Sequence, residues 1–87
     1  MLEITTWTDP EATLKAKKGI ILSSRVHPGE TGASFMIKGV IAFVLGPSMQ
    51  ARVLWDTYVI RVIPMLNPDG VILGCTRCSL VGKDLNR

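Results

Sequence analysis

Hydrophobic residues along this chain follow two different spacings, which predict where strands and helices lie. Apolar and polar residues alternate over positions 2–6, which predicts a short strand, and the apolar run 20–22 predicts a strand buried on both faces. From Thr31 to Leu45 the spacing is helical, and apolar residues occupy most of the circumference, so we expect a helix buried between layers. A second strong strand is expected over Tyr58 to Leu66.

Shorter signals mark the ends of these elements. Residues 8–11 (Thr-Asp-Pro-Glu) have the form of a helix start with Thr8 as the cap, and a polar loop there remains an alternative. The Gly-Pro pair at 46–47 is expected to end the long helix. Residues 48–55 are expected to form a second short helix with three apolar side chains turned inward, Met49, Val53 and Leu54.

The chain after the second strand changes character. Residues 67–70, Asn-Pro-Asp-Gly, favour a type I turn with a purely structural role, and residues 71–87 lack a periodic pattern and predict an irregular loop. Strand, helix and strand in this order predict a βαβ crossover, right-handed if the strands are parallel. The expected fold class is therefore α/β.

Composition narrows the class of protein. Eighty-seven residues form one small domain at most, or part of a larger one, and 47% hydrophobic residues exclude a disordered chain. The net charge is +3, but the one basic cluster, Lys15, Lys17 and Lys18, suits a solvated edge better than a nucleic-acid surface. No apolar stretch is long enough to span a membrane, and the first residues do not form a signal peptide. We therefore expect a cytoplasmic protein whose two cysteines are free thiols.

The stretch 25–30 (Arg-Val-His-Pro-Gly-Glu) joins the first buried strand to the long helix. It holds the only histidine of the chain, with a glutamate three residues later. Ligands and metals collect at the carboxyl ends of strands in open α/β sheets, and side chains three residues apart in a turn share one side. Both residue types suit zinc, so we predict that His27 and Glu30 are two ligands of a catalytic zinc ion. The same residues also suit an ordinary turn.

The final loop carries further candidate residues. Arg77 and Arg87 could grip a carboxylate by bidentate hydrogen bonds, with Asn86 as a neutral donor, or could be ordinary surface charges. Cys75 and Cys78 form a C-x-x-C pair, which leaves open a redox site, a zinc knuckle or a metal site shared with the histidine.

Three ordered stretches resemble the zinc carboxypeptidases, and more narrowly the cytosolic branch whose members remove glutamate from tubulin. They are residues 24–31 (SRVHPGET), residues 63–71 (IPMLNPDGV), and a third block made of RCSL at 77–80 and GKDLNR at 82–87. The resemblance covers most of the chain from about Gly19 onward.

The resemblance implies a fold and a set of roles. The fold would be part of an α/β/α sandwich with a mixed sheet. His27 and Glu30 would be the first two zinc ligands, and Arg77 would polarise the scissile carbonyl. Asn86 and Arg87 would hold the C-terminal carboxylate of a peptide substrate. That substrate would end in acidic residues, as polyglutamylated tubulin does, and no nucleic acid or membrane would be involved.

The same resemblance sets a limit on this chain. The family uses a third zinc ligand, a histidine, and a catalytic glutamate that both lie far downstream of the first block, and this sequence has no second histidine. We therefore expect residues 1–87 to be the N-terminal portion of a carboxypeptidase catalytic domain, inactive as an isolated chain. The alternative is a non-catalytic binding or assembly module derived from that domain.

Overall fold

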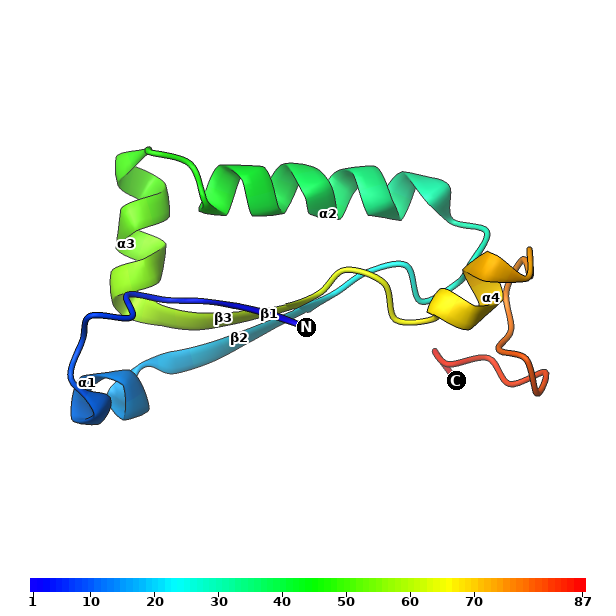
Figure 1. Cartoon of the computed structure of the whole chain (residues 1–87), viewed down its shortest axis with the longest axis horizontal. Helices are drawn as coiled ribbons and strands as arrows, with labels where there is room; N and C mark the ends of the chain where they lie inside the picture. The colour runs from blue at the N-terminus through cyan, green and yellow to red at the C-terminus, as the bar shows by residue number, and fades with distance from the viewer.

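The computed structural model describes all 87 residues as a mixed three-stranded sheet with four helices. The elements in chain order are β1 (Leu2–Ile4), α1 (Glu11–Ala16), β2 (Lys18–Ser23), α2 (Thr31–Val44), α3 (Met49–Thr57), β3 (Tyr58–Ile63) and α4 (Pro68–Ile72). The strand order is β1-β3-β2, with β3 antiparallel to β1 and parallel to β2. Helix α2 lies along one face of the sheet and α3 closes one end (Figure 1). The predicted α/β class and mixed sheet are confirmed.

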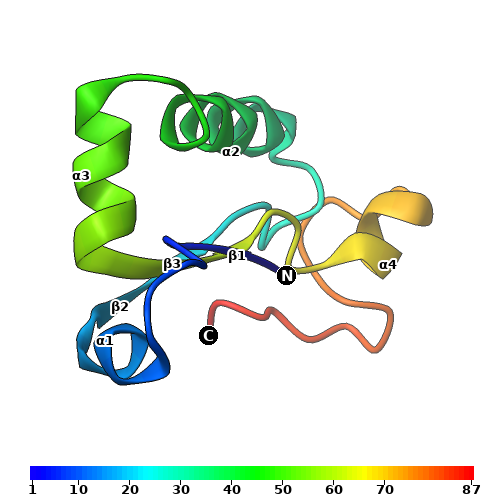
Figure 2. The same ribbon diagram turned by 60° about the vertical axis from the view of Figure 1, so that its left-hand side comes forward.

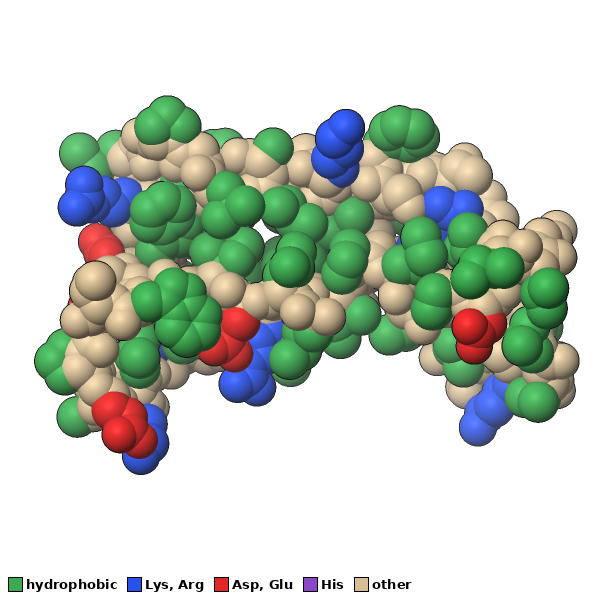
Figure 3. Space-filling model, in the orientation of Figure 1, with side chains coloured by type: hydrophobic (Ala, Val, Ile, Leu, Met, Phe, Trp, Pro, Cys, Tyr) green, Lys and Arg blue, Asp and Glu red, His purple; other side chains and the backbone are tan.

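The core lies between the central strand and α2. Alternation along β3 buries Ile60 and Val62, and Ile60 lies in register with Ile4 of β1. Helix α2 adds Ile37 and Val44 to the same cluster. Apolar side chains gather along the band between α2 and the sheet (Figure 3). Period-two spacing in the strand and helical spacing in α2 thus meet in one small core.

Strand β2 is not buried on both faces, so that prediction was wrong. Ile21 is 71% exposed and lies in register with Arg61 on the sheet face opposite α2. Arg61 in turn forms an ion pair with Glu3 across the sheet, at 2.6 Å. The outer face is therefore partly polar, and β2 forms one edge of the sheet.

Helix α2 occupies the expected residues, but it is not buried between layers as its composition predicted. Phe35 and Met36 are each 75% exposed, and Phe43 is exposed as well. Only Ile37 and Val44 of this helix are buried. One stripe of α2 therefore packs on the sheet while the other apolar stripe faces away from it.

Helix α3 begins as predicted, and Ser48 caps it by accepting a hydrogen bond from the Ala51 amide at 3.2 Å. Leu54 packs against the core, which confirms one of the three inward positions. Met49 and Val53 are exposed, so those two predictions were wrong. Ala51 is the one fully buried residue of α3.

Two local predictions need correction. Helix α1 forms, but its N-cap is Pro10 and no side chain caps it, so Thr8 has no capping role. Proline fits this position because its ring fixes φ, which is −57° here. The predicted turn at 67–70 continues into helix α4, with Asn67 as its N-cap.

No single helix is both long and apolar enough to cross a membrane. Helices α2 and α3 together reach that length and composition, but they meet at 90°. Figure 2 shows α3 turning away from the end of α2 toward the sheet.

Candidate metal centre

The loops that carry the candidate residues start at the carboxyl ends of the parallel strands β2 and β3. Strands β2 and β3 stay joined beyond their ends, because the Ser24 amide donates to the Ile63 carbonyl at 2.9 Å and the Leu66 amide donates to the Ser24 carbonyl at 3.0 Å. In open α/β sheets this carboxyl edge is where ligands bind. Parallel pairing thus brings residues 24–30 beside residues 64–78.

Two glycines let these loops pack closely together. The Gly29 amide donates to the Thr76 carbonyl at 2.8 Å, and a Cβ at Gly29 would lie only 2.8 Å from the same oxygen. A Cβ at Gly70 would lie 2.5 Å from Cγ of Pro28. Each glycine is therefore required by the close approach of another backbone or ring.

Asn67 connects the two later segments and is almost fully buried. Its Oδ1 accepts from the Gly70 amide at 3.1 Å, and its Nδ2 donates to the Cys78 carbonyl at 3.3 Å. The Asn-Pro-Asp-Gly stretch therefore has the structural role expected for it: it fixes α4 against the following loop.

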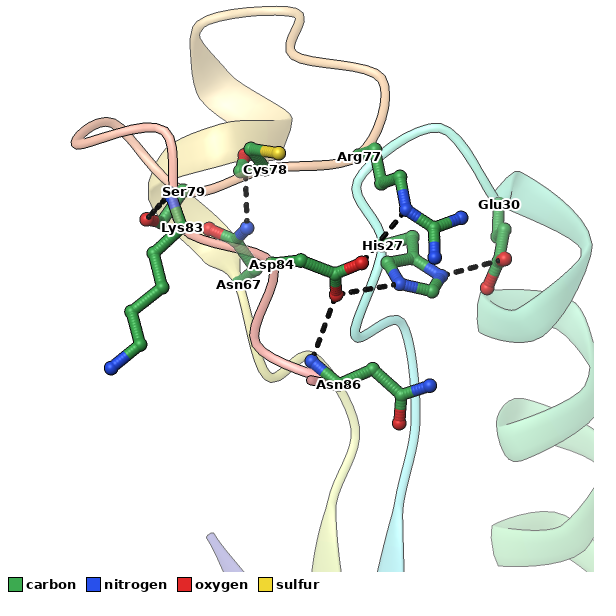
Figure 4. Close-up of polar contacts among 9 residues, drawn as sticks. All are labelled: His27, Glu30, Asn67, Arg77, Cys78, Ser79, Lys83, Asp84 and Asn86. Atoms are coloured by element: carbon green, nitrogen blue, oxygen red, sulfur yellow. Dashed lines mark hydrogen bonds and ion pairs between the residues drawn. The ribbon is translucent and has the colours of Figure 1, made fainter.

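His27 lies at the centre of the site and is only 7% exposed. Its Nδ1 lies 2.9 Å from Oε1 of Glu30, which stands at the start of α2. Its Nε2 lies 3.1 Å from Oδ1 of Asp84, a residue 57 positions later in the chain. The ring is held between two carboxylates (Figure 4), and the structure brings the two candidate ligands His27 and Glu30 together.

Asp84 reaches the site through a turn over residues 79–83. Gly82 adopts a positive φ of 75° and donates its amide to the Ser79 carbonyl at 2.9 Å, which reverses the chain. The Asp84 carboxylate accepts from the Asn86 amide at 2.9 Å and from Nε of Arg77 at 2.8 Å. These contacts, the Asn86 amide first, lower the pKa of Asp84 from 3.8 to about 2.

The contacts of His27 limit its protonation state. The ionised Asp84 carboxylate only accepts, so the Nε2 that faces it carries the hydrogen. Nδ1 faces the Glu30 carboxylate, another acceptor, at 2.9 Å, so a proton lies between these two atoms in the zinc-free chain. Metal-bound histidines commonly donate their second ring N–H to a carboxylate. An imidazole nitrogen and a carboxylate oxygen are both ligand types that zinc accepts, and their 2.9 Å separation here is that of a hydrogen bond.

The three other predicted residues are placed differently from one another. Arg77 lies beside His27 (Figure 4), because both side chains bond to the carboxylate of Asp84. Asn86 contacts Asp84 through its backbone amide, and its exposed side chain points away from that carboxylate. The Arg87 side chain is exposed and makes no hydrogen bond or ion pair. Only Arg77 is thus joined to the histidine by side-chain contacts.

The metal-binding alternatives for the cysteines find no support. Cys75 and Cys78 are free thiols, and no three His, Cys, Asp or Glu side chains are placed to share a metal ion. A site formed by both cysteines and His27 is therefore contradicted, and a zinc knuckle has too few ligands.

Asp84 was missed from the sequence. It belongs to the block GKDLNR, two residues before Asn86, so the resemblance covered it but gave it no role. A single aspartate in an irregular loop has no spacing that marks it. Its role follows only from contacts between residues distant in sequence.

The surroundings of His27 lead to a prediction about the zinc-free chain. The hydrogen bond to Glu30, then the bond to Asp84, raise the pKa of His27 above its ordinary 6.5, while the charge of Arg77 lowers it. We expect Glu30→Gln to lower this pKa and Arg77→Gln to raise it, as read from the imidazole proton of the only histidine by NMR. Equal shifts in one direction for both variants would contradict the assignment.

The sign of the stability effect follows from this shift. A raised pKa in the folded state means that His27 stabilises the zinc-free chain fully below pH 6.5, and the contribution is lost as pH rises through the raised pKa. The lowered pKa of Asp84 acts oppositely: its contribution is present above pH 3.8 and is lost as pH falls toward about 2.

Comparison with known proteins places this arrangement in a class of metal-dependent peptidases. The sequence model of the family described as zinc carboxypeptidase matches residues 1–87, the whole chain. This protein belongs to the zinc carboxypeptidase family.

Individual relatives agree with this assignment. The chain is 53% identical over 88 residues to cytosolic carboxypeptidase 3 of Mus musculus, and 51% identical over 87 residues to cytosolic carboxypeptidase 2 of Homo sapiens. It is covered completely in both comparisons and spans 9% and 10% of those relatives. A metallo-carboxypeptidase from Burkholderia cenocepacia has a similar structure, with a TM-score of 0.82 and 31% identity, covering 98% of this chain and 23% of that chain. The expected carboxypeptidase-like fold is confirmed.

Proposed function

We propose that this chain supplies two ligands and an arginine to the zinc site of a cytoplasmic metallocarboxypeptidase that removes C-terminal residues, glutamate in particular, from proteins such as tubulin. The observation that carries the proposal is the His27 ring, held by Asp84 on one side and facing the Glu30 carboxylate on the other. Membership of the zinc carboxypeptidase family and relatives named cytosolic support it.

Four residues of this chain would each have a separate role at the zinc site. His27 and Glu30 would hold zinc, which supplies Lewis-acid activation of water when bound. Asp84 keeps the hydrogen on Nε2 of His27 and so leaves Nδ1 free to bind the ion. Arg77 lies beside the ring, where its guanidinium could stabilise negative charge developing on a carbonyl oxygen.

The last two residues of the chain would bind the substrate. Asn86 and Arg87 have exposed side chains, which are free to hold the C-terminal carboxylate of a peptide. A guanidinium such as that of Arg87 can form two parallel hydrogen bonds with a carboxylate. An acidic chain end would also meet the positive charge of Arg77.

A zinc titration of the purified chain tests the metal site directly. Because His27 is the only histidine, its imidazole signals in NMR report the site without ambiguity. We expect saturable changes of these signals on adding Zn2+ and a large loss of affinity in Glu30→Gln. His27→Ala lacks the reporting imidazole, so its Zn2+ binding is measured by isothermal titration calorimetry, and we expect it to be lost. Glu11→Gln is the matched control, since Glu11 pairs with Lys15 on exposed α1 and its loss leaves the affinity unchanged. Equal affinities for Glu30→Gln and Glu11→Gln would contradict the proposal.

We also propose that residues 1–87 alone do not hydrolyse peptides. Two protein ligands are fewer than the three of typical catalytic zinc sites. Incubating the zinc-loaded chain with a peptide ending in polyglutamate is expected to release no glutamate, and steady turnover would contradict this point.

A binding or assembly module is the second candidate, and the exposed surface of α2 favours it. Phe35 and Met36 are exposed, and a groove of about 310 Å³ runs between α2 and the end of β2, lined in part by Val26, Met36 and Val40. Apolar surface of this kind often marks an interaction site. Size-exclusion chromatography separates the readings: a defined complex supports a module, whereas a monomer or a broad aggregate does not.

A further inference from the structure

Arg25 is the one residue other than glycine with a positive φ, at 51°. It lies two residues after the end of β2 and two residues before His27, where the chain leaves the sheet. Left-handed backbone is unfavourable for a residue with a Cβ, and such strain tends to occur where function requires it. Something in the surroundings must therefore hold this residue.

The Arg25 side chain supplies that hold. Its Nε donates to the Pro28 carbonyl at 2.7 Å, and its Nη1 donates to Oγ of Ser34 at 2.8 Å. Hydrogen bonds from a charged guanidinium are stronger than neutral ones, and its planar fork fixes their directions. One end thus grips the loop between His27 and Glu30, and the other grips the first turns of α2.

The two points that Arg25 anchors, the loop at Pro28 and the start of α2 at Ser34, flank Glu30 and so set its position relative to His27. Glu30 is the N-cap residue of α2 but makes no side-chain capping bond, so its own contacts do not fix the helix start. The 2.9 Å separation of the imidazole and carboxylate therefore depends on how the loop meets the helix. Ser24 adds a neighbouring bond from its hydroxyl to the Ala33 carbonyl, at 2.9 Å.

We propose that Arg25 is a positioning residue for the metal donors: it holds the loop 27–30 and the start of α2 together, so that His27 and Glu30 face the same ion. This inference rests on the proposed zinc site. Both contacts of the guanidinium are internal, so its role differs from that of Arg77, which lies beside the histidine ring.

The test compares Zn2+ affinities by NMR titration of the His27 imidazole in the full chain. Arg25→Gly removes the guanidinium but relieves the positive φ, so it separates side-chain positioning from backbone strain. We expect its Zn2+ affinity to fall by about 10- to 100-fold, the usual cost of removing a residue that supports a metal ligand. Arg25→Lys keeps the charge and should recover part of this loss. Arg52→Gln, which removes an exposed arginine with no side-chain contact on α3, is the matched control and should bind Zn2+ as the parent chain does.

A second variant keeps the test decisive if Arg25→Gly does not fold. Ser34→Ala removes one acceptor of the guanidinium and retains a good helix former, and we expect a smaller but measurable loss of Zn2+ affinity. The inference is overturned if Arg25→Gly binds Zn2+ as tightly as the parent chain does. If that variant does not fold, the inference is overturned when both Arg25→Lys and Ser34→Ala have the parent's Zn2+ affinity. The zinc proposal fails separately, if isothermal titration calorimetry gives His27→Ala the same Zn2+ affinity as the parent chain.

Discussion

Replacing Ile60 by alanine is expected to lower the free energy of unfolding by about 2–5 kcal/mol. Ile60 is 2% exposed on the central strand β3, and it lies in register between Ile4 and Ile20. The truncation would leave a cavity that the sheet cannot close, because strands pair with β3 on both sides. In a chain of this size such a loss is a large share of the total stability.

The control for this variant is Ile21→Ala on the neighbouring strand. It deletes the same atoms, but Ile21 is exposed on the opposite face of the sheet, so we expect a change within about 0.5 kcal/mol. Urea unfolding followed by circular dichroism measures both variants. Equal losses would mean that the outer face of the sheet is covered and that the core has been assigned to the wrong side.

A methyl group at Gly29 is expected to destabilise the site and the fold together. The Cβ of Gly29→Ala would lie 2.8 Å from the Thr76 carbonyl oxygen, a backbone atom that cannot move without shifting its loop. Overpacking of this kind usually costs about 1–3 kcal/mol. The variant should also lose the 2.8 Å bond from the Gly29 amide to that carbonyl, and with it the contact between the histidine loop and the loop after α4.

Gly39→Ala is the matched control for this change. Gly39 lies within α2 and a Cβ there meets no atom within 4 Å, so alanine should raise stability by about 0.5–1 kcal/mol. Thermal unfolding gives both signs in one experiment, and the amide signals of Thr76 in NMR should shift for Gly29→Ala only. A stabilising Gly29→Ala would show that the two loops do not pack closely.

The main elements could be predicted because their signals are local. The apolar run 20–22 lies within β2, and the helical spacing from Thr31 placed α2 to within one residue. Which side each element buries was harder to predict, because burial depends on neighbours. Ile21 of β2 and Phe35 of α2 have sequence contexts typical of buried residues, yet both side chains are largely exposed.

The site was predictable in part for the same reason. His27 and Glu30 are three residues apart, so a turn brings them together whatever the rest of the chain does. Asp84 approaches from 57 residues away, and its place depends on the turn at Gly82 and on the docking of Gly29. No periodicity in the sequence encodes such a contact.

The ring of contacts around Asp84 also fixes the charge balance of the site. With His27 protonated, the imidazolium and the Arg77 guanidinium offset the two carboxylates of Glu30 and Asp84. A divalent cation in place of the Nδ1 proton would leave one unit of positive charge uncompensated and would release a proton to the solvent. Metal loading would thus change the net charge of the site from zero to positive, and the site would attract anions. The heat of zinc binding would depend on the ionisation enthalpy of the buffer, because the buffer takes up the released proton.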